Sequence, residues 1–207
     1  MVTKGQFLER PTLIPVGKLV MEGVSHRGAL SPLLLVLPPP PAEGGGMDHV
    51  VGAELAFAAS AAGHPTLRFN YRGVGASQGS RGAGEALVED ALAALEVAVD
   101  NAGGGPVVVA SLNGSDPVAL ELLARKPEQV LAACLISPTT SHPARWDDRV
   151  WAVIGELDKT LSRSVVGSSR ARIEWVGSAD RTFQRGLPQV GKAVVACLTS
   201  AATSRKH

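Results

Sequence analysis

Residues 106–118 read Pro-Val-Val-Val-Ala-Ser-Leu-Asn-Gly-Ser-Asp-Pro-Val, and this stretch carries the pattern that decides the fold. Its first half is a continuous apolar run, which is typical of a strand buried on both faces. A sharp turn follows, and Ser115 stands where a side chain caps the first turn of a helix. The segment therefore predicts a strand over 106–111, a turn, and a helix over 115–125.

The alternation of strands and helices continues on both sides of this segment. An antiparallel pair over 12–16 and 18–25 comes first, with its turn at Gly17. Beyond it, apolar strands alternate with helices, which predicts an α/β fold with a mostly parallel sheet and helices on both faces. In such sheets the functional crevice lies beyond the C-terminal ends of the strands. The remaining predicted strands are 32–37, 65–71, 130–137, 150–155 and 171–176, and the remaining predicted helices are 49–62, 85–99 and 186–202.

The size and charge of the chain exclude several classes of protein. Its 207 residues suit a single domain, 1–207, with a full core. A net charge of +1 and an aromatic content of 4% disfavour nucleic-acid binding, which needs a basic surface and stacking rings. We find no apolar leader run and no apolar stretch long enough to cross a bilayer. We therefore expect a cytoplasmic protein without a membrane partner.

Cysteines and histidines give no sign of a metal or cofactor site. Cys134 and Cys197 each lie in an apolar stretch, which predicts two buried thiols in a reducing compartment rather than a disulfide. His49 stands at a helix start and His64 in a turn, and no cluster has metal-ligand spacing. The glycines of loop 73–77 do not have the spacing of a dinucleotide-binding loop. We expect no cofactor and no metal ion.

Residues 66–77, Thr-Leu-Arg-Phe-Asn-Tyr-Arg-Gly-Val-Gly-Ala-Ser, are followed closely by Gly79. This segment is similar to the Arg-Phe-Asn-aromatic-Arg-Gly-x-Gly-x-Ser-x-Gly pattern of the α/β-hydrolase superfamily. The chain resembles most its small, lid-less bacterial branch, which is related to dienelactone-hydrolase-like esterases, over about residues 12–202. The resemblance implies the α/β-hydrolase fold without a lid domain. Because relatives carry Arg68 and Arg72 as part of the scaffold, we expect a structural role for both rather than anion binding.

The catalytic triad that the resemblance implies is incomplete. The family holds its nucleophile on a strand-to-helix turn as Gly-x-Ser-x-Gly, and the matching residues 110–114 put Leu112 at that position. The acid matches Asp158, and the base position in 177–183 is taken by Arg181. Leucine has no lone pair for attack, and arginine stays protonated near neutral pH, so neither residue can perform the family's chemistry.

No other residue nearby in the sequence supplies the missing base, and the first oxyanion loop also departs from the family pattern. The only histidine after Asp158 is His207, the last residue, while His26, His49, His64 and His142 all precede Asp158. Where relatives often read His-Pro-His-Pro in the first oxyanion loop, this chain has Pro38 to Pro41, and proline has no N–H to donate. The glycines of 44–46 remain as candidate donors.

In this fold, Asp158 and Arg181 would occupy the neighbouring acid and base positions of the triad. We therefore predict an ion pair between their side chains.

Two functions of different classes follow. The first is a catalytically inactive pseudo-hydrolase that serves ligand binding or protein interaction, which rests on Leu112 and Arg181. The alternative is a serine hydrolase, an esterase of small esters or thioesters, with Ser111 or Ser115 as a displaced nucleophile. Without that displacement, Ser111 simply ends a strand and Ser115 caps a helix.

The partner of a pseudo-hydrolase is expected to be a small-molecule ligand or another protein. A polar loop over the presumed crevice, 142–148, begins at His142 and carries Arg145 and Trp146, with Arg149 directly after it. Such residues suit a protein contact, although an ordinary connecting loop explains them equally well. A homodimer is compatible with a small domain of this type, but nothing in the sequence defines an interface.

Overall fold

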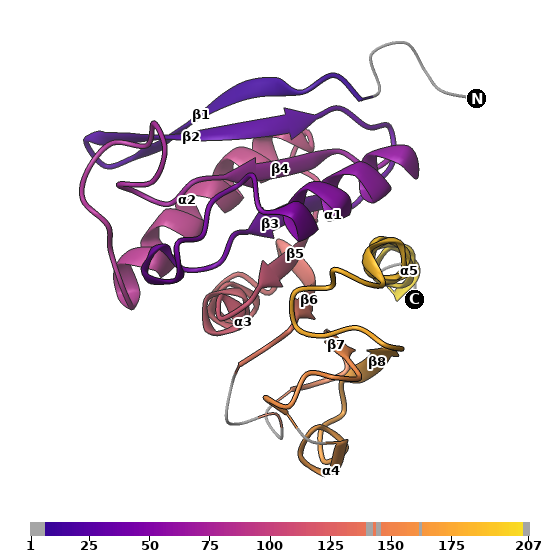
Figure 1. The fold of residues 1–207 in the computed structure, drawn as a ribbon. Helices are drawn as coiled ribbons and strands as arrows, with labels where there is room; N and C mark the ends of the chain where they lie inside the picture. The colour runs from indigo at the N-terminus through magenta and orange to yellow at the C-terminus, as the bar shows by residue number, and fades with distance from the viewer. Residues whose placement is uncertain (1–6, 140–142, 144–145, 162, 205–207) are drawn as a thin grey trace.

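An eight-stranded sheet forms the centre of the molecule (Figure 1). The computed structural model describes residues 7–139, 143, 146–161 and 163–204. The strand order across the sheet is β1-β2-β4-β3-β5-β6-β7-β8. β1 and β2 form an antiparallel pair, β2 lies antiparallel to β4, and all other neighbours are parallel, which confirms the predicted sheet. The strands are β1 (Arg10–Val16), β2 (Leu19–His26), β3 (Leu33–Leu37), β4 (Thr66–Phe69), β5 (Val107–Leu112), β6 (Val130–Ile136), β7 (Val150–Gly155) and β8 (Arg172–Val176).

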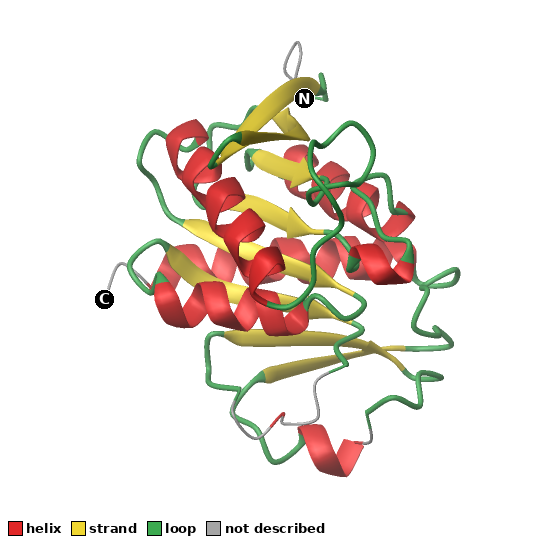
Figure 2. Ribbon diagram, turned by 90° about the vertical axis from the view of Figure 1, so that its left-hand side faces the viewer, coloured by secondary structure: helices red, strands yellow, loops and turns green. Residues whose placement is uncertain are grey.

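Helices cover both faces of the sheet, as predicted (Figure 2). α1 (Val50–Ala61) and α5 (Leu187–Ser204) pack together on one face, and α2 (Glu85–Asn101) and α3 (Asp116–Arg125) lie on the other. The short α4 (Arg163–Val166) and a 3-10 turn, η1 (Pro41–Glu43), belong to loops. The connection between β6 and β7, residues 137–149, is too short for a lid domain. Within the described part of the chain, no helix is both long enough and apolar enough to span a bilayer.

The central strand β5 contributes to both layers of the core. Val107 and Val109 belong to the apolar cluster under α2 and α3, whereas Val108, Ala110 and Leu112 belong to the cluster under α1 and α5. Because successive side chains of a strand point to opposite faces, burial on both faces requires the continuous apolar run that the sequence shows.

Both cysteines lie in the layer under α1 and α5, one on β6 and one on α5. Cys134 and Cys197 are free and fully buried, which confirms that they do not form a disulfide. A hydrogen bond with Cys197, together with complete burial, raises the pKa of the Cys134 thiol. The thiol therefore stays protonated, and protonated thiols are poor nucleophiles.

The segment 66–77 ties the strand ends to the surrounding loops. Arg68 donates to the Met47 carbonyl at 2.8 Å and forms an ion pair with Glu9. Arg72 donates to the carboxylate of Asp90 through its backbone N–H at 2.9 Å and through Nε at 2.7 Å. Both guanidinium groups are thus held by scaffold contacts, which confirms the structural role expected for them.

Asp90 provides a direct test of this scaffold, since its side chain is completely buried and its oxygens serve Arg72 alone among the described hydrogen bonds. We expect Asp90→Ala to lower the free energy of unfolding by about 2–3 kcal/mol, because it leaves a backbone N–H without an acceptor and removes the buried carboxylate partner of the partly buried Arg72 guanidinium. Urea unfolding measures this loss.

Glu89→Ala is the matched control, because Glu89 binds the same guanidinium at 3.0 Å but is exposed. An exposed ion pair contributes about 0–1 kcal/mol, so this variant should unfold almost as the parent does. Equal stabilities of the two variants would contradict the role assigned to Asp90.

Candidate functional site

The turn after β5 lies at the C-terminal end of the central strand, between the ends of β3 and β6. Its strained residues are Asn113, with φ of 35°, and Gly114, with φ of 93°. Asparagine and glycine are the residues that adopt this left-handed region most readily. Leu112 is still part of β5 and is 1% exposed. The expectation that Leu112 forms the apex is therefore wrong by one residue, since Asn113 takes that position.

The packing of Leu112 explains the shift. Its side chain continues the series of Val108 and Ala110 on the face under α1 and α5. Its Cδ1 atom lies only 3.1 Å from the point that a Cβ of Gly52, on α1, would occupy. Since the leucine is enclosed by this layer, the strand extends through it, and the chain reverses only at the next residue.

Asn113 stands where serine hydrolases of this type hold the nucleophile, on the strained strand-to-helix turn. A carboxamide offers an acceptor oxygen and an NH2 donor, but no hydroxyl or thiol that a base can activate. The amide of Asn113 can bind a ligand through hydrogen bonds and cannot attack one.

Ser111 and Ser115 flank the turn, and neither is placed as a nucleophile. Ser111 is 1% exposed and lies inside β5, paired with Leu37 of β3 and Leu135 of β6. Ser115 precedes α3, but its hydroxyl makes no cap hydrogen bond and instead donates to the carbonyl of Pro38 at 2.5 Å. Its expected capping role is therefore wrong. No histidine is a hydrogen-bond partner of either hydroxyl in the part of the chain described.

The acid and base positions lie in the turns after β7 and β8. Asp158 is 9% exposed, and its Oδ1 accepts the N–H of Thr160 at 2.9 Å. The carbonyl of Arg181 accepts the hydroxyl of Ser137 at 3.0 Å, so the β8 turn lies against the end of β6. Among the described ion pairs, none within 4.0 Å joins Asp158 to Arg181. The predicted ion pair is wrong: the two turns are joined instead by the Leu157 N–H, which donates to the Ala179 carbonyl at 2.9 Å.

Ser137 is a feature that sequence reasoning missed. It follows β6, is completely buried, and has a φ of 47°, a conformation that is unusual for serine. No sequence pattern marks such a residue, because the strain arises from the neighbouring turn that its hydroxyl binds.

Most backbone N–H groups of the 44–46 loop are already hydrogen-bonded and cannot bind an oxyanion. The N–H groups of Gly44 and Gly45 donate to the carbonyls of Pro41 and Pro40, at 3.1 and 3.3 Å, within the 3-10 turn. These two glycines are therefore unavailable as donors. Gly46 is the remaining candidate from the loop.

Gly114 supplies a second candidate N–H, directly after the apex. In this part of the described chain, neither its N–H nor that of Gly46 has an acceptor within hydrogen-bonding distance. However, Glu43 Oε1 lies 3.0 Å from the point that a Cβ of Gly114 would occupy. A carboxylate at this position repels a developing oxyanion, whereas real oxyanion sites present donors.

His49 is the residue directly before α1, as expected for a helix-start residue, and is one turn from Gly52. Its Nδ1 atom is buried and has no hydrogen-bond partner. Burial lowers the pKa of His49, because the charged imidazolium is desolvated. His64 is bound to the Pro32 carbonyl at 2.8 Å, in agreement with its expected turn position.

Of the polar loop at 142–148, the structure describes residues 143 and 146–148. Trp146 is 1% exposed and belongs to the core layer under α2 and α3. Arg149 is bound to Asp147 at 2.9 Å. His142 and Arg145 lie outside the described residues. Trp146 is therefore part of the core and is not available for a surface contact.

Solved structures similar to this chain are α/β hydrolases. The lid-less α/β serine hydrolase XC6422 from Xanthomonas campestris matches with a TM-score of 0.77 and 21% identity, over 93% of this chain and 94% of that one. A serine hydrolase homologue from Coxiella burnetii gives 0.76 and 22%, over 91% and 97%. Dienelactone hydrolase from Anabaena variabilis gives 0.73 and 16%, over 91% and 94%. The chain has the α/β-hydrolase fold. No family model matches it, and no curated protein sequence does.

The lowered pKa of His49 predicts a pH dependence of stability. Because its folded pKa lies below the unfolded value of 6.5, the unfolded state binds more protons as the pH falls through that value, and stability is lost. We expect the unfolding free energy to decrease between about pH 7.5 and pH 5.5, and to decrease less in His49→Gln. Urea unfolding at both pH values measures the difference. Identical pH slopes in variant and parent would contradict the burial of an uncharged His49.

Proposed function

We propose that this chain is a non-catalytic relative of the α/β hydrolases, a pseudo-hydrolase whose crevice binds a small molecule. The observation that carries the proposal is Asn113 at the apex of the turn after β5, where the chemistry requires a nucleophile. Arg181 at the base position supports it independently, since a guanidinium cannot accept a proton near neutral pH.

The remaining groups of the crevice suit binding rather than catalysis. The N–H groups of Gly46 and Gly114 are available donors, and Arg181 has no carboxylate partner among the described ion pairs. A ligand with a neutral carbonyl group fits the two N–H donors. Asn113 adds one donor and one acceptor, and Glu43 adds an acceptor that selects ligands carrying a hydroxyl or amine.

Small neutral esters or lactones are the ligand class that this donor set favours, since Glu43 beside Gly114 repels an anionic group. The similar structures include serine hydrolases and a dienelactone hydrolase, so a ligand of ester or lactone type is also consistent with the shared fold. Protein interaction is the other role open to a pseudo-hydrolase, but the buried Trp146 does not contribute to a surface for it.

Restoring the missing groups tests the proposal. We expect the parent chain to hydrolyse p-nitrophenyl acetate no faster than the buffer does. Asn113→Ser combined with Arg181→His should raise the rate by at least about tenfold, because it returns a nucleophile and a base to a site that retains Asp158. Each single substitution alone should give no gain.

Leu112→Ser combined with Arg181→His is the matched control. It should give no activity and should melt at a lower temperature, since it removes a buried leucine and leaves a cavity. Activity in this variant instead of the first would contradict the assignment of the apex to Asn113. Hydrolysis by the parent chain that Ser111→Ala or Ser115→Ala abolishes would establish the alternative, a serine esterase with a displaced nucleophile.

A further inference from the structure

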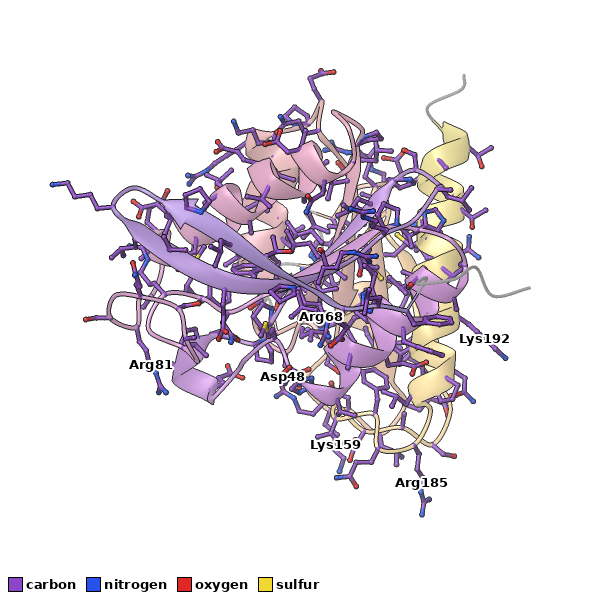
Figure 3. All side chains as sticks on the ribbon, turned by 90° about the horizontal axis from the view of Figure 1, so that it is seen from above. Asp48, Arg68, Arg81, Lys159, Arg185 and Lys192 are labelled. Atoms are coloured by element: carbon purple, nitrogen blue, oxygen red, sulfur yellow. The ribbon has the colours of Figure 1, made fainter. Side chains whose placement is uncertain are left out.

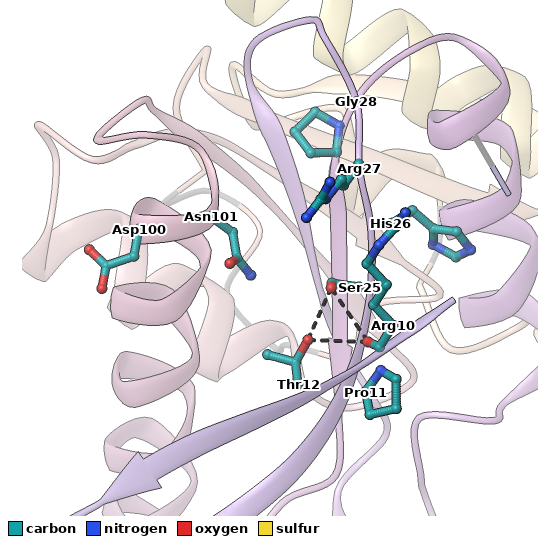
Figure 4. A pocket seen from close by; sticks show the side chains of 10 residues that line it. Arg10, Pro11, Thr12, Ser25, His26, Arg27, Gly28, Asp100 and Asn101 are labelled. Carbon is teal, nitrogen blue, oxygen red and sulfur yellow. Dashed lines mark hydrogen bonds between the residues drawn. The ribbon is translucent and has the colours of Figure 1, made fainter. Parts of the chain in front are cut away.

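A polar pocket of about 620 Å³ opens at the edge of the sheet opposite the crevice. The end of β2 pairs with the beginning of β4, His26 opposite Thr66, so this edge holds the N-terminal ends of the parallel strands. The wall facing β1 and β2 is formed by the C-terminal end of α2 (Figure 4). The pocket is therefore separate from the turn after β5 and from every residue of the proposed crevice.

The pocket arises from one face of the β1–β2 pair. Ile14 and Met21 on this face are fully buried in the core layer under α2. Because side chains of one face recur at every second residue, the same face continues through Thr12 and Arg10 on β1, and through Ser25 on β2. Arg10 stands directly opposite Ser25 in the register. Polar residues thus replace apolar ones on this face where α2 comes to its end.

The β1–β2 wall carries two guanidinium groups, and its hydroxyls are bound to each other and to the Arg10 carbonyl. Ser25 and Thr12 are hydrogen-bonded to each other at 3.0 Å, and the Thr12 hydroxyl also lies 3.3 Å from the Arg10 carbonyl (Figure 4). Arg10 donates to the Leu8 carbonyl at 3.0 Å, which fixes its side chain without neutralising it. Arg27 is exposed and has no ion-pair partner among the described residues. Two guanidinium groups with adjacent hydroxyls favour a carboxylate or phosphate.

The opposite wall is a set of acceptors. Asp100 and Asn101 stand at the end of α2, across the pocket from Arg27 in Figure 4. The carbonyl end of a helix carries partial negative charge, which adds to the charge of Asp100. His26 lines the pocket between the walls, and burial lowers its pKa, so it adds no charge near neutral pH. Hydroxyl or ammonium groups are the partners that suit the Asp100 wall.

We propose that this pocket binds a small metabolite that carries a carboxylate or phosphate at one end and hydroxyl or ammonium donors at the other. The anionic end lies against Arg10 and Arg27, and the donor end lies against Asp100 and Asn101. The volume is in the range of sites for small ligands. The proposal is independent of the function assigned to the crevice.

Calorimetric titration of the full chain with three probes tests the proposal. Inorganic phosphate carries the anion alone, glucose 6-phosphate adds hydroxyls, and L-serine combines a carboxylate with an ammonium group. We expect glucose 6-phosphate or L-serine to bind more tightly than inorganic phosphate, and the tighter of the two identifies the source of the anion. The absence of heat from all three probes at concentrations up to about 10 mM would overturn the proposal.

Arg27→Ala is the decisive variant, because Arg27 is exposed and its loss leaves the fold intact. It should weaken binding of the tighter probe by about tenfold. Arg185→Ala is the charge-matched control, since Arg185 is exposed at the molecular surface (Figure 3) and does not line the pocket; it should bind as the parent does. Equal affinity in the Arg27 variant and the parent would overturn the site.

Asp100→Asn separates the two ends of the ligand. The substitution should lower the affinity for the tighter of glucose 6-phosphate and L-serine, whose donor end loses a charged acceptor. The affinity for inorganic phosphate should stay the same or rise, because a negative charge near the phosphate is removed. Weaker binding of inorganic phosphate in this variant would contradict the assignment of the anionic end to the arginines.

Discussion

The reversal of the chain between β5 and α3 is the constraint on which the site depends. The chain changes direction at Asn113 and Gly114, whose backbones both have positive φ angles. The turn is fixed on both sides, because Asn113 N–H donates to Ile136 at the end of β6 and Ser115 donates to Pro38 after β3. The end of β5 is thus hydrogen-bonded to residues at the ends of both neighbouring strands, β3 and β6. These contacts fix the positions of the loops around the turn.

This constraint explains why the fold does not depend on a nucleophile at the turn. The turn requires residues that tolerate positive φ and a buried strand before it, and neither requirement concerns reactivity. Asparagine meets the conformational requirement without supplying a nucleophile. The hydrogen bonds of Arg68, Arg72 and Asp90 also do not involve a catalytic group. They hold the sheet and its loops in place whichever residue stands at the apex. The same frame can therefore carry a binding site or a catalytic one, and the pseudo-hydrolase that we propose is the first of these.

The sequence predicts most of the fold because the parallel strands are continuous apolar runs bounded by turns. Aligning the five-residue family pattern on its final glycine puts Leu112 at the apex, whereas the backbone reverses at the Asn113–Gly114 pair. The absent Asp158–Arg181 ion pair and the buried Trp146 depend on how separate loops pack, which no local pattern encodes. The pocket between β2 and α2 cannot be predicted from the sequence, because it depends on the β1–β2 register, which places Arg10 opposite Ser25.

Labelling with a fluorophosphonate probe, followed by intact-mass spectrometry, tests the central claim most directly, with an active serine hydrolase labelled in parallel. The absence of an activatable nucleophile predicts that the mass of this chain stays unchanged while the active enzyme gains one probe. A stoichiometric adduct mapped to Ser111, Ser115 or Ser137 would contradict the account, because it would show a serine activated by a base that the turn at Asn113 does not provide.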